Sequence, residues 1–119
     1  MSLETLASQF VEMCNQGKNF DVMHAMYAPE IVSVEATGEE TRGKKPVIEK
    51  SERWQAINTI GSERVRGPYL NGPNQFAVHY TFEVTPKATG QRVTLEEVGV
   101  YTVKNDKITR EQFFYDGDH

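Results

Sequence analysis

The sequence predicts a single α+β domain, spanning residues 1–119, in which three N-terminal helices pack in the concave face of a curved, mostly antiparallel sheet. Three observations predict it. Apolar residues recur at helical spacing before residue 61, whereas from residue 62 they favour a two-residue period. Short turn sequences separate the later segments, so consecutive strands pair antiparallel. Helices that precede a run of hairpin-linked strands gather on one face of the sheet.

Two helices and a proline stop are predicted first. Apolar side chains at spacings of three and four predict a helix over residues 3–16, which Gly17 ends. A second short helix is predicted over residues 20–27. Pro29 ends this helical segment, because proline lacks a backbone N–H and its ring clashes with the preceding turn. The face predicted to be apolar on the second helix consists of Phe20, Met23, His24 and Tyr27.

A short strand and a third helix follow. Residues 31–36 form a short segment rich in β-branched side chains, which predicts a strand that carries one acid, Glu35. Residues 37–43 are polar and are predicted to form a loop. Pro46 suits the first turn of a third helix, which Gly61 is predicted to end. The apolar side of this helix consists of Val47, Ile48, Trp54 and Ile57.

Four hairpin-linked strands complete the chain, over residues 62–70, 76–85, 92–103 and 108–115. The second of them alternates most clearly, and its predicted inner face consists of Phe76, Val78, Tyr80, Phe82 and Val84. The outer face is too apolar for a fully solvated sheet, which predicts a homodimer that packs sheet to sheet through the convex face. That outer face carries Ala77, His79, Thr81, Val98 and Val100.

Composition excludes several classes of partner. A net charge of −4 disfavours nucleic acid and anionic membranes as main partners. Cys14 is the single cysteine, so no internal disulfide is expected, and a reducing cytoplasmic location fits best. We expect no signal peptide, and no apolar run approaches the roughly 18 residues of a membrane span. We expect no cofactor and no metal, since the sequence lacks a phosphate-binding loop and the three histidines, His24, His79 and His119, lack ligand spacing.

This order of elements resembles the nuclear transport factor 2-like superfamily, specifically its SnoaL-like and ketosteroid isomerase-like members. The resemblance is carried by Met26-Tyr27-Ala28, by the strand ending in Glu35, by Gly43, and by Val98–Val103 and Lys107–Tyr115 around the Asn105-Asp106 turn. It implies a cone-shaped fold with a conical cavity. Isomerases, cyclases, dehydratases, epoxide hydrolases and plain binding proteins share such a fold, so the resemblance implies fold more strongly than activity.

The same resemblance implies roles for individual residues. An ungapped comparison puts Glu35 at the general-base aspartate of ketosteroid isomerase, and Tyr27 at a tyrosine that supports the oxyanion site. The two main oxyanion donors of that enzyme correspond here to Val11 and Gly99, and neither side chain can donate a hydrogen bond. Steroid isomerisation by that mechanism is therefore not expected.

Three carboxylates are the candidate catalytic residues. Glu35 serves as a base if it lines the cavity, where burial raises the pKa of a carboxylate; the alternative is a salt bridge at a strand end. The comparison of the last two strands turns Glu97 and Glu111 inward, where two carboxylates in one pocket would raise the pKa of one of them. A register slip of one residue would expose both.

Candidate ligand-binding residues surround these acids. Tyr27 or Tyr101 would donate a hydrogen bond to the ligand. Trp54 and Tyr80 would stack on a planar molecule or simply belong to the core, and His24 is a ligand contact or a hydrogen-bonded core residue. The remaining candidates are Val78, Phe113 and Tyr115.

Together these features predict a protein that binds a small apolar or aromatic molecule. The predicted activity is acid/base chemistry without a cofactor, of the isomerase, cyclase, dehydratase or hydrolase type. A non-catalytic ligand-binding or dimerisation module of the same fold is the alternative.

Overall fold

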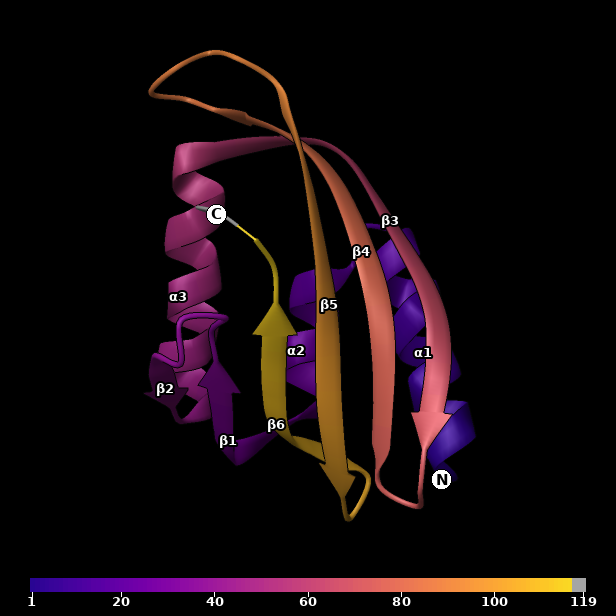
Figure 1. Cartoon of the computed structure of the whole chain (residues 1–119). Coiled ribbons are helices and arrows are strands. Elements are labelled where there is room, and N and C mark those ends of the chain that lie inside the picture. Colours follow the sequence, from indigo (N-terminus) through magenta and orange to yellow (C-terminus); the bar gives the residue numbers. More distant parts are fainter. Residues whose placement is uncertain (117–119) are drawn as a thin grey trace.

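One curved six-stranded sheet and three helices make up the fold (Figure 1). The structure, a computed structural model, describes residues 1–116, so His119 lies outside the described part. The sheet has the order β2-β1-β6-β5-β4-β3, and neighbouring strands are antiparallel except for the parallel pair β1 and β6. The predicted α+β architecture, with helices packed against a mostly antiparallel sheet, is confirmed.

The helices are held by caps and by their buried faces. Helix α1 (Leu3–Asn15) begins after Ser2, whose hydroxyl accepts a hydrogen bond from the Thr5 N–H at 3.1 Å. Helix α2 (Asn19–Met26) buries Val22 and Met26, which are four residues apart on one face. Helix α3 (Lys44–Ile57) carries Pro46 in its first turn, as predicted.

His24 does not lie on the apolar face of α2, so that prediction is wrong. Because Val22 and Met26 define the buried face, His24 is turned to the exposed side of the helix. Its backbone carbonyl accepts a hydrogen bond from Lys44 Nζ at 2.6 Å. The predicted helical position of Tyr27 is also wrong, because Tyr27 is the first residue of a strand.

The N-terminal strands differ from the prediction. Strand β1 (Tyr27–Val34) starts directly where α2 ends, and its register with β6 is interrupted between Tyr27 and Val32, the stretch that contains Pro29. Glu35 therefore follows the strand instead of belonging to it. Strand β2 (Glu40–Arg42) lies inside the predicted polar loop and pairs with β1.

The four long strands follow the predicted order. Strand β3 (Asn58–Asn71) begins immediately after α3, so Gly61 does not end the helix but lies in a bulge between Ile60 and Ser62. Strands β4 (Gln75–Pro86), β5 (Val93–Lys104) and β6 (Lys107–Phe114) form a meander. The alternation predicted for β4 is confirmed, since its five inner-face residues from Phe76 to Val84 are buried.

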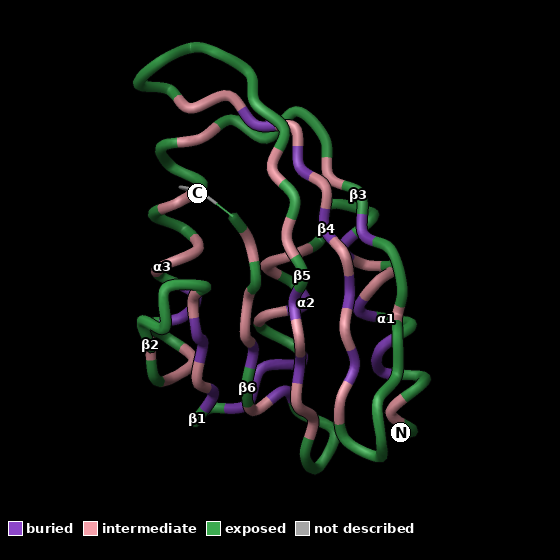
Figure 2. The backbone as a smooth tube through the Cα atoms, in the orientation of Figure 1, coloured by how far each residue is buried: buried purple, intermediate pink, exposed green. Residues whose placement is uncertain are grey.

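The core lies between the helices and the concave face of the sheet. Figure 2 shows buried residues alternating along the strands and lining the facing side of the helices. The Phe10 ring of α1 lies 4.6 Å from the Tyr101 ring and 5.3 Å from the Phe76 ring, centroid to centroid. Within residues 1–116, no helix is long and apolar enough to cross a membrane.

Candidate functional site

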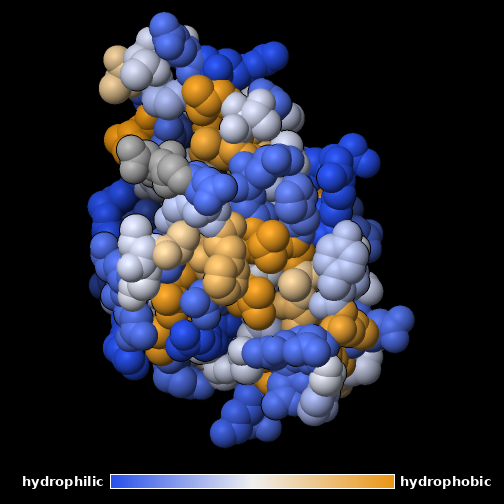
Figure 3. All heavy atoms as spheres, in the orientation of Figure 1, coloured by the Kyte–Doolittle hydropathy of each residue, from blue (hydrophilic) through white to orange (hydrophobic). Residues whose placement is uncertain are grey.

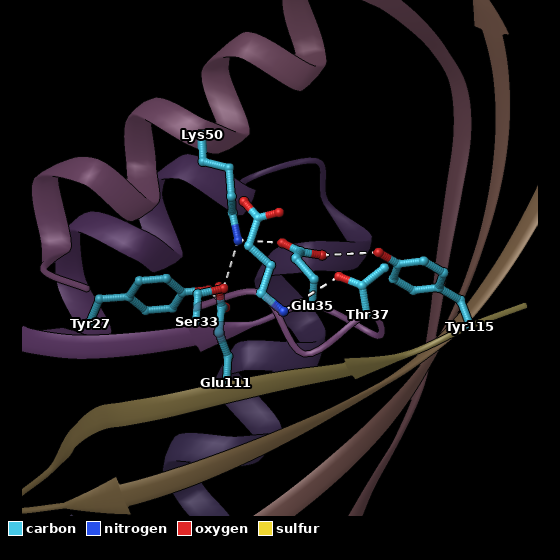
Figure 4. A network of polar contacts seen from close by, with 8 residues as sticks. Tyr27, Ser33, Glu35, Thr37, Lys50, Glu111 and Tyr115 are labelled. Atoms are coloured by element: carbon cyan, nitrogen blue, oxygen red, sulfur yellow. Dashed lines mark hydrogen bonds and ion pairs between the residues drawn. The ribbon is translucent and has the colours of Figure 1, made fainter. Parts of the chain in front are cut away.

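A continuous chain of polar contacts crosses the concave side of the sheet (Figure 4). It begins at Glu111 on β6, which is 2% exposed. The Tyr27 hydroxyl donates to Oε1 of this carboxylate, and the Ser33 hydroxyl donates to Oε2 at 2.7 Å. A buried carboxylate is stabilised only when such donors satisfy its oxygens, so these two contacts explain how Glu111 is tolerated in the core.

Lys50 of α3 continues the chain toward the surface. Its Nζ donates to Ser33 Oγ at 2.7 Å and to Glu35 Oε1 at 2.5 Å. The second oxygen of Glu35 accepts a hydrogen bond from the Tyr115 hydroxyl at 3.2 Å. Tyr27 and Tyr115 therefore stand at opposite ends of one connected network, as Figure 4 shows.

Local structure explains why these side chains meet. Ser33 and Glu111 are direct partners in the parallel register of β1 and β6, so their side chains lie on the same face. Glu35 directly follows β1, and its carboxylate meets the same Lys50 ammonium group as the Ser33 hydroxyl. Lys50 lies three residues after the buried Val47 and four before Trp54, which puts it on the face of α3 that is turned toward the sheet.

Burial dominates the electrostatics at the inner end. It raises the pKa of Glu111, and the hydrogen bonds from Ser33 and Tyr27 and the charge of Lys50 oppose this shift. Burial also raises the pKa of Tyr27 well above its usual value, and the Glu111 carboxylate adds to this effect. Tyr27 therefore keeps its proton at neutral pH and acts as a hydrogen-bond donor.

Glu97 on β5 is the acid best suited to proton transfer. It is half-buried and lies on the same sheet face as Tyr101 and Glu111. Burial is the main cause that raises its pKa to about 7, and Glu35, Glu111 and Glu63 raise it further, whereas Lys50 lowers it. A carboxyl group with such a pKa exchanges protons near neutral pH, which general acid/base catalysis requires.

A hollow of about 460 Å³ has this acid among its lining residues. It opens near the end of β6, because β6 ends at Phe114, opposite Val98, whereas β5 already begins at Val93. Glu97 and Tyr115 therefore connect the polar network to a surface hollow. The residues that line the hollow are Ala36, His79, Glu96, Glu97, Val98, Phe114, Tyr115 and Asp116.

A second polar pair lies deeper in the core. The Tyr80 and Tyr101 hydroxyls are 2.5 Å apart, and the two side chains are 5% and 1% exposed. Burial raises the pKa of both phenols well above the usual value, so both keep their protons. The pair can bind an oxygen atom only if a ligand reaches the core.

Most predicted site residues converge on this region. Tyr27, Glu35, Glu111 and Tyr115 belong to one network, Phe113 lies beneath Lys50, and Glu97 lines the adjoining hollow. The pairing of Tyr101 with Glu111 and of Gly99 with Phe113 agrees with the inward register predicted for the last two strands. Glu35 forms the salt bridge that was its alternative, with a side chain that is 26% exposed.

The other predicted contacts lie elsewhere. Val78 is completely buried in the hydrophobic core. Trp54 is half-buried, with its ring 6.2 Å from that of Phe82. His24 is exposed on α2 and does not contribute to the polar network.

Three site residues were not predicted from the sequence: Ser33, Lys50 and Glu63. Lys50 shares the helical spacing of Val47 and Trp54, and a charged residue within an apolar stripe was the available signal. Ser33 has the strand parity of Ile31, which is also buried. Glu63 on β3 accepts a hydrogen bond from Asn19 Nδ2 at 2.7 Å, and burial raises its pKa to about 7.

Comparison with known proteins identifies the family. The model of the SnoaL-like domain matches residues 1–115. A crystal structure from Mesorhizobium loti, described as a proposed SnoaL-like polyketide cyclase and also labelled a carbohydrate phosphatase, is 44% identical, with a TM-score of 0.92 over 97% of this chain and 100% of that chain. No curated protein matches.

More distant structures share the fold. A proposed polyketide cyclase from Pseudomonas putida is 19% identical, with a TM-score of 0.78 over 98% of this chain and 92% of that one. A hypothetical protein with a ketosteroid isomerase-like fold from Catenulispora acidiphila, in complex with trimethylamine, is 16% identical, with a TM-score of 0.72 over 98% and 88% of the two chains. On the evidence of the family model and of the relative from Mesorhizobium loti, this chain belongs to the SnoaL-like domain family.

Proposed function

We propose that this protein binds a small, neutral, apolar or aromatic carbonyl compound and catalyses proton transfer on it without a cofactor, by aldol-type cyclisation or isomerisation. One observation carries the proposal: Glu97, a half-buried acid with a pKa of about 7, lines a hollow that adjoins the Glu35–Lys50–Tyr115 network. Glu97 is the proposed general base, a role for which Glu35 is less suited because it is ion-paired with Lys50.

The proposed step is removal of a proton next to a carbonyl group. The C–H bond breaks, the proton passes to a carboxylate oxygen of Glu97, and the electron pair forms an enolate whose negative charge lies on the former carbonyl oxygen. In a cyclisation, the enolate carbon forms a C–C bond with a second carbonyl carbon, and the resulting alkoxide takes up a proton. In an isomerisation, the proton returns to a different carbon atom.

The surroundings of Glu97 favour a neutral substrate. Glu35, Glu63 and Glu111 all act on Glu97 electrostatically, and Lys50 is the cation that opposes them. A phosphate monoester, which carries up to two negative charges, would meet several carboxylates for one lysine, a larger repulsion than a single oxyanion meets. This disfavours for this chain the phosphatase activity named for the Mesorhizobium loti relative. The cyclase names of two relatives agree with enolate chemistry.

A non-catalytic ligand-binding module is the second candidate. The observation that favours it is the ion pair between Lys50 and Glu35, since ion pairs of this kind also occur as purely structural elements. Under this alternative the hollow binds a small molecule and no bond changes.

The test measures exchange of α-protons for deuterium in a panel of small cyclic and aromatic ketones, by NMR in deuterium oxide. The wild-type protein should accelerate exchange for at least one ketone, and Glu97→Gln should lower that rate about 10²–10⁴-fold. Glu12→Gln is the matched control, because Glu12 is an exposed glutamate on α1 that does not line the hollow.

Each outcome has a meaning. Exchange that Glu97→Gln leaves unchanged would contradict the assignment of the base. Ketones that shift protein resonances without any exchange would instead establish the binding module.

A further inference from the structure

We propose that Lys50 is a catalytic residue that stabilises the oxyanion formed in this reaction, and that Glu35 and Ser33 are positioning residues for its ammonium group. The inference rests on the proposed function, which requires a group that accepts the negative charge of the enolate oxygen. Preorganised donors aimed at such an oxygen are among the largest contributions to catalysis.

The contacts of the ammonium group fix its position. Nζ lies 2.7 Å from Ser33 Oγ and 2.5 Å from Glu35 Oε1; Ser33 belongs to β1 and Glu35 directly follows that strand. An ammonium group has three N–H donors. Among the described residues, the hydrogen bonds drawn in Figure 4 occupy two of these donors, so the third can bind a ligand oxygen.

The surroundings of Lys50 increase the effect of its charge. Nζ lies 5.9 Å from the centre of the Phe113 ring, and Phe113 is itself half-buried against the core. An apolar wall lowers the local dielectric constant, and a charge interaction is stronger there than in water. The lysine side chain is 24% exposed, so a ligand can approach it without opening the core.

The buried phenols are a less suitable oxyanion site. Tyr80 and Tyr101 already form a close hydroxyl pair and are 5% and 1% exposed. A ligand oxygen would have to enter the packed core to reach them. Lys50 instead extends from α3 to the middle of the network, between Ser33 and Glu35, and its charge lowers the pKa of the Glu97 carboxyl group.

The role proposed for Glu35 differs from that of a base. Its carboxylate holds the ammonium group with one oxygen and accepts the Tyr115 hydroxyl with the other. Removal of the Glu35 charge would leave Lys50 less neutralised and therefore more attractive to an anion. Tighter anion binding after removal of the Glu35 charge is therefore expected if Glu35 positions Lys50, and is not expected if Glu35 only accepts a proton.

The test uses para-nitrophenol, whose phenolate stands for the oxyanion and whose two protonation states differ in colour. Binding is followed by the fluorescence of Trp54, the single tryptophan, which lies four residues after Lys50 on α3. The protein is titrated with the probe at one pH below and one pH above the pKa of free para-nitrophenol. The first titration gives the affinity for the phenol and the second the affinity for the phenolate. The wild-type protein should bind the phenolate at least about tenfold more tightly than the phenol.

Four variants make the result specific. Lys50→Met should abolish the preference for the phenolate, and Lys50→Arg should retain part of it. Lys45→Met, the same change at an exposed position of α3, should leave it unchanged. Glu35→Gln should increase the preference, and it tests the inference even if Lys50→Met fails to fold.

The outcomes separate this inference from the proposed function. Three results would each overturn the role of Lys50. The phenolate preference could survive in Lys50→Met, Glu35→Gln could fail to increase it, or the wild-type protein could bind neither form of the probe. Dependence of ketone exchange on Glu97, measured separately, would still support the function. A Lys50-dependent phenolate preference without exchange of any ketone would leave Lys50 as an anion-binding residue and contradict the function.

Discussion

The ring of Tyr101 lies directly over Gly99. A Cβ atom at position 99 would lie 2.9 Å from the hydroxyl and 2.9 Å from Cε2 of Tyr101. The ring cannot easily move away, because it is stacked on Phe76 at 5.0 Å and contacts Phe10 at 4.6 Å. The absence of a side chain at Gly99 thus allows Tyr101 to reach the Tyr80 hydroxyl.

Gly99→Ala should therefore destabilise the protein. Overpacking of a rigid core typically costs about 1–3 kcal/mol, and we expect a loss of free energy of unfolding in this range, measured by urea denaturation. Gly61→Ala is the control, because its Cβ would meet its nearest neighbour at 3.4 Å, an ordinary contact, and Gly61 is exposed. A Gly99→Ala protein as stable as the wild type would show that the Tyr101 ring is mobile.

Trp54→Ala should cost less than the loss of a fully buried aromatic residue. Complete burial would predict a loss of about 3–5 kcal/mol, but Trp54 is only half-buried against Phe82, so we expect about 2 kcal/mol. Chemical denaturation of the variant measures the difference. A loss well under 1 kcal/mol would mean that the indole ring contributes little to packing.

The outer face of the sheet should form the interface of a homodimer. Hydrophobic atoms gather over the middle of this face in Figure 3, and the paired residues Val98 and Phe114 are 37% and 50% exposed. Both residues also line the hollow, so a second copy of the chain would border its opening in such a dimer. We expect a twofold dimer with sheets packed face to face. Sedimentation at micromolar concentration should give a dimer, and Phe114→Glu should give a monomer. A wild-type protein that sediments only as a monomer would rule the interface out.

Stability should fall as the pH rises from about 4.5 to about 7. Burial raises the pKa of Glu63 from 4.5 to about 7, so the folded state binds more protons than the unfolded state in this interval, and Glu97 and Glu111 act in the same direction. Glu63→Gln should reduce the slope of the free energy of unfolding against pH. Glu52→Gln, the same change at an exposed position, should leave this slope unchanged. An identical slope in the two variants would contradict the shift at Glu63.

Sequence periodicity predicted the elements that bury one face. The alternation from Phe76 to Val84 identified β4 and its inner side, because burial of a sheet face requires that pattern. It could not identify β2, since Glu40, Thr41 and Arg42 are polar and the strand is held by its pairing with β1. The parallel pairing of β1 with β6 joins residues far apart in sequence, which periodicity does not encode.

The candidate site was predicted only in part, because strand parity can be read from the sequence but tertiary partners cannot. Strand parity turned Glu97 and Glu111 inward, but the pairing next to the Asn105-Asp106 turn, if continued, would place Glu111 opposite Val100. The register shift between Thr102 and Val103 instead brings Glu111 opposite Tyr101. Lys50 was missed because charged residues on helices are usually solvated, and its partners Ser33 and Glu35 are distant in the sequence. The role of Glu35 changed because a salt bridge depends on a partner that only the tertiary fold supplies.

The most direct test of an acid/base site needs no substrate. The carboxyl carbon of Glu97 can be followed by carbon-13 NMR over a pH titration, and its resonance assigned by its absence in Glu97→Gln. Because burial and the neighbouring carboxylates raise its pKa, we predict a titration midpoint of about 7. A midpoint near the value of about 4.3 for a solvated glutamate would contradict the assignment of Glu97 as the general base.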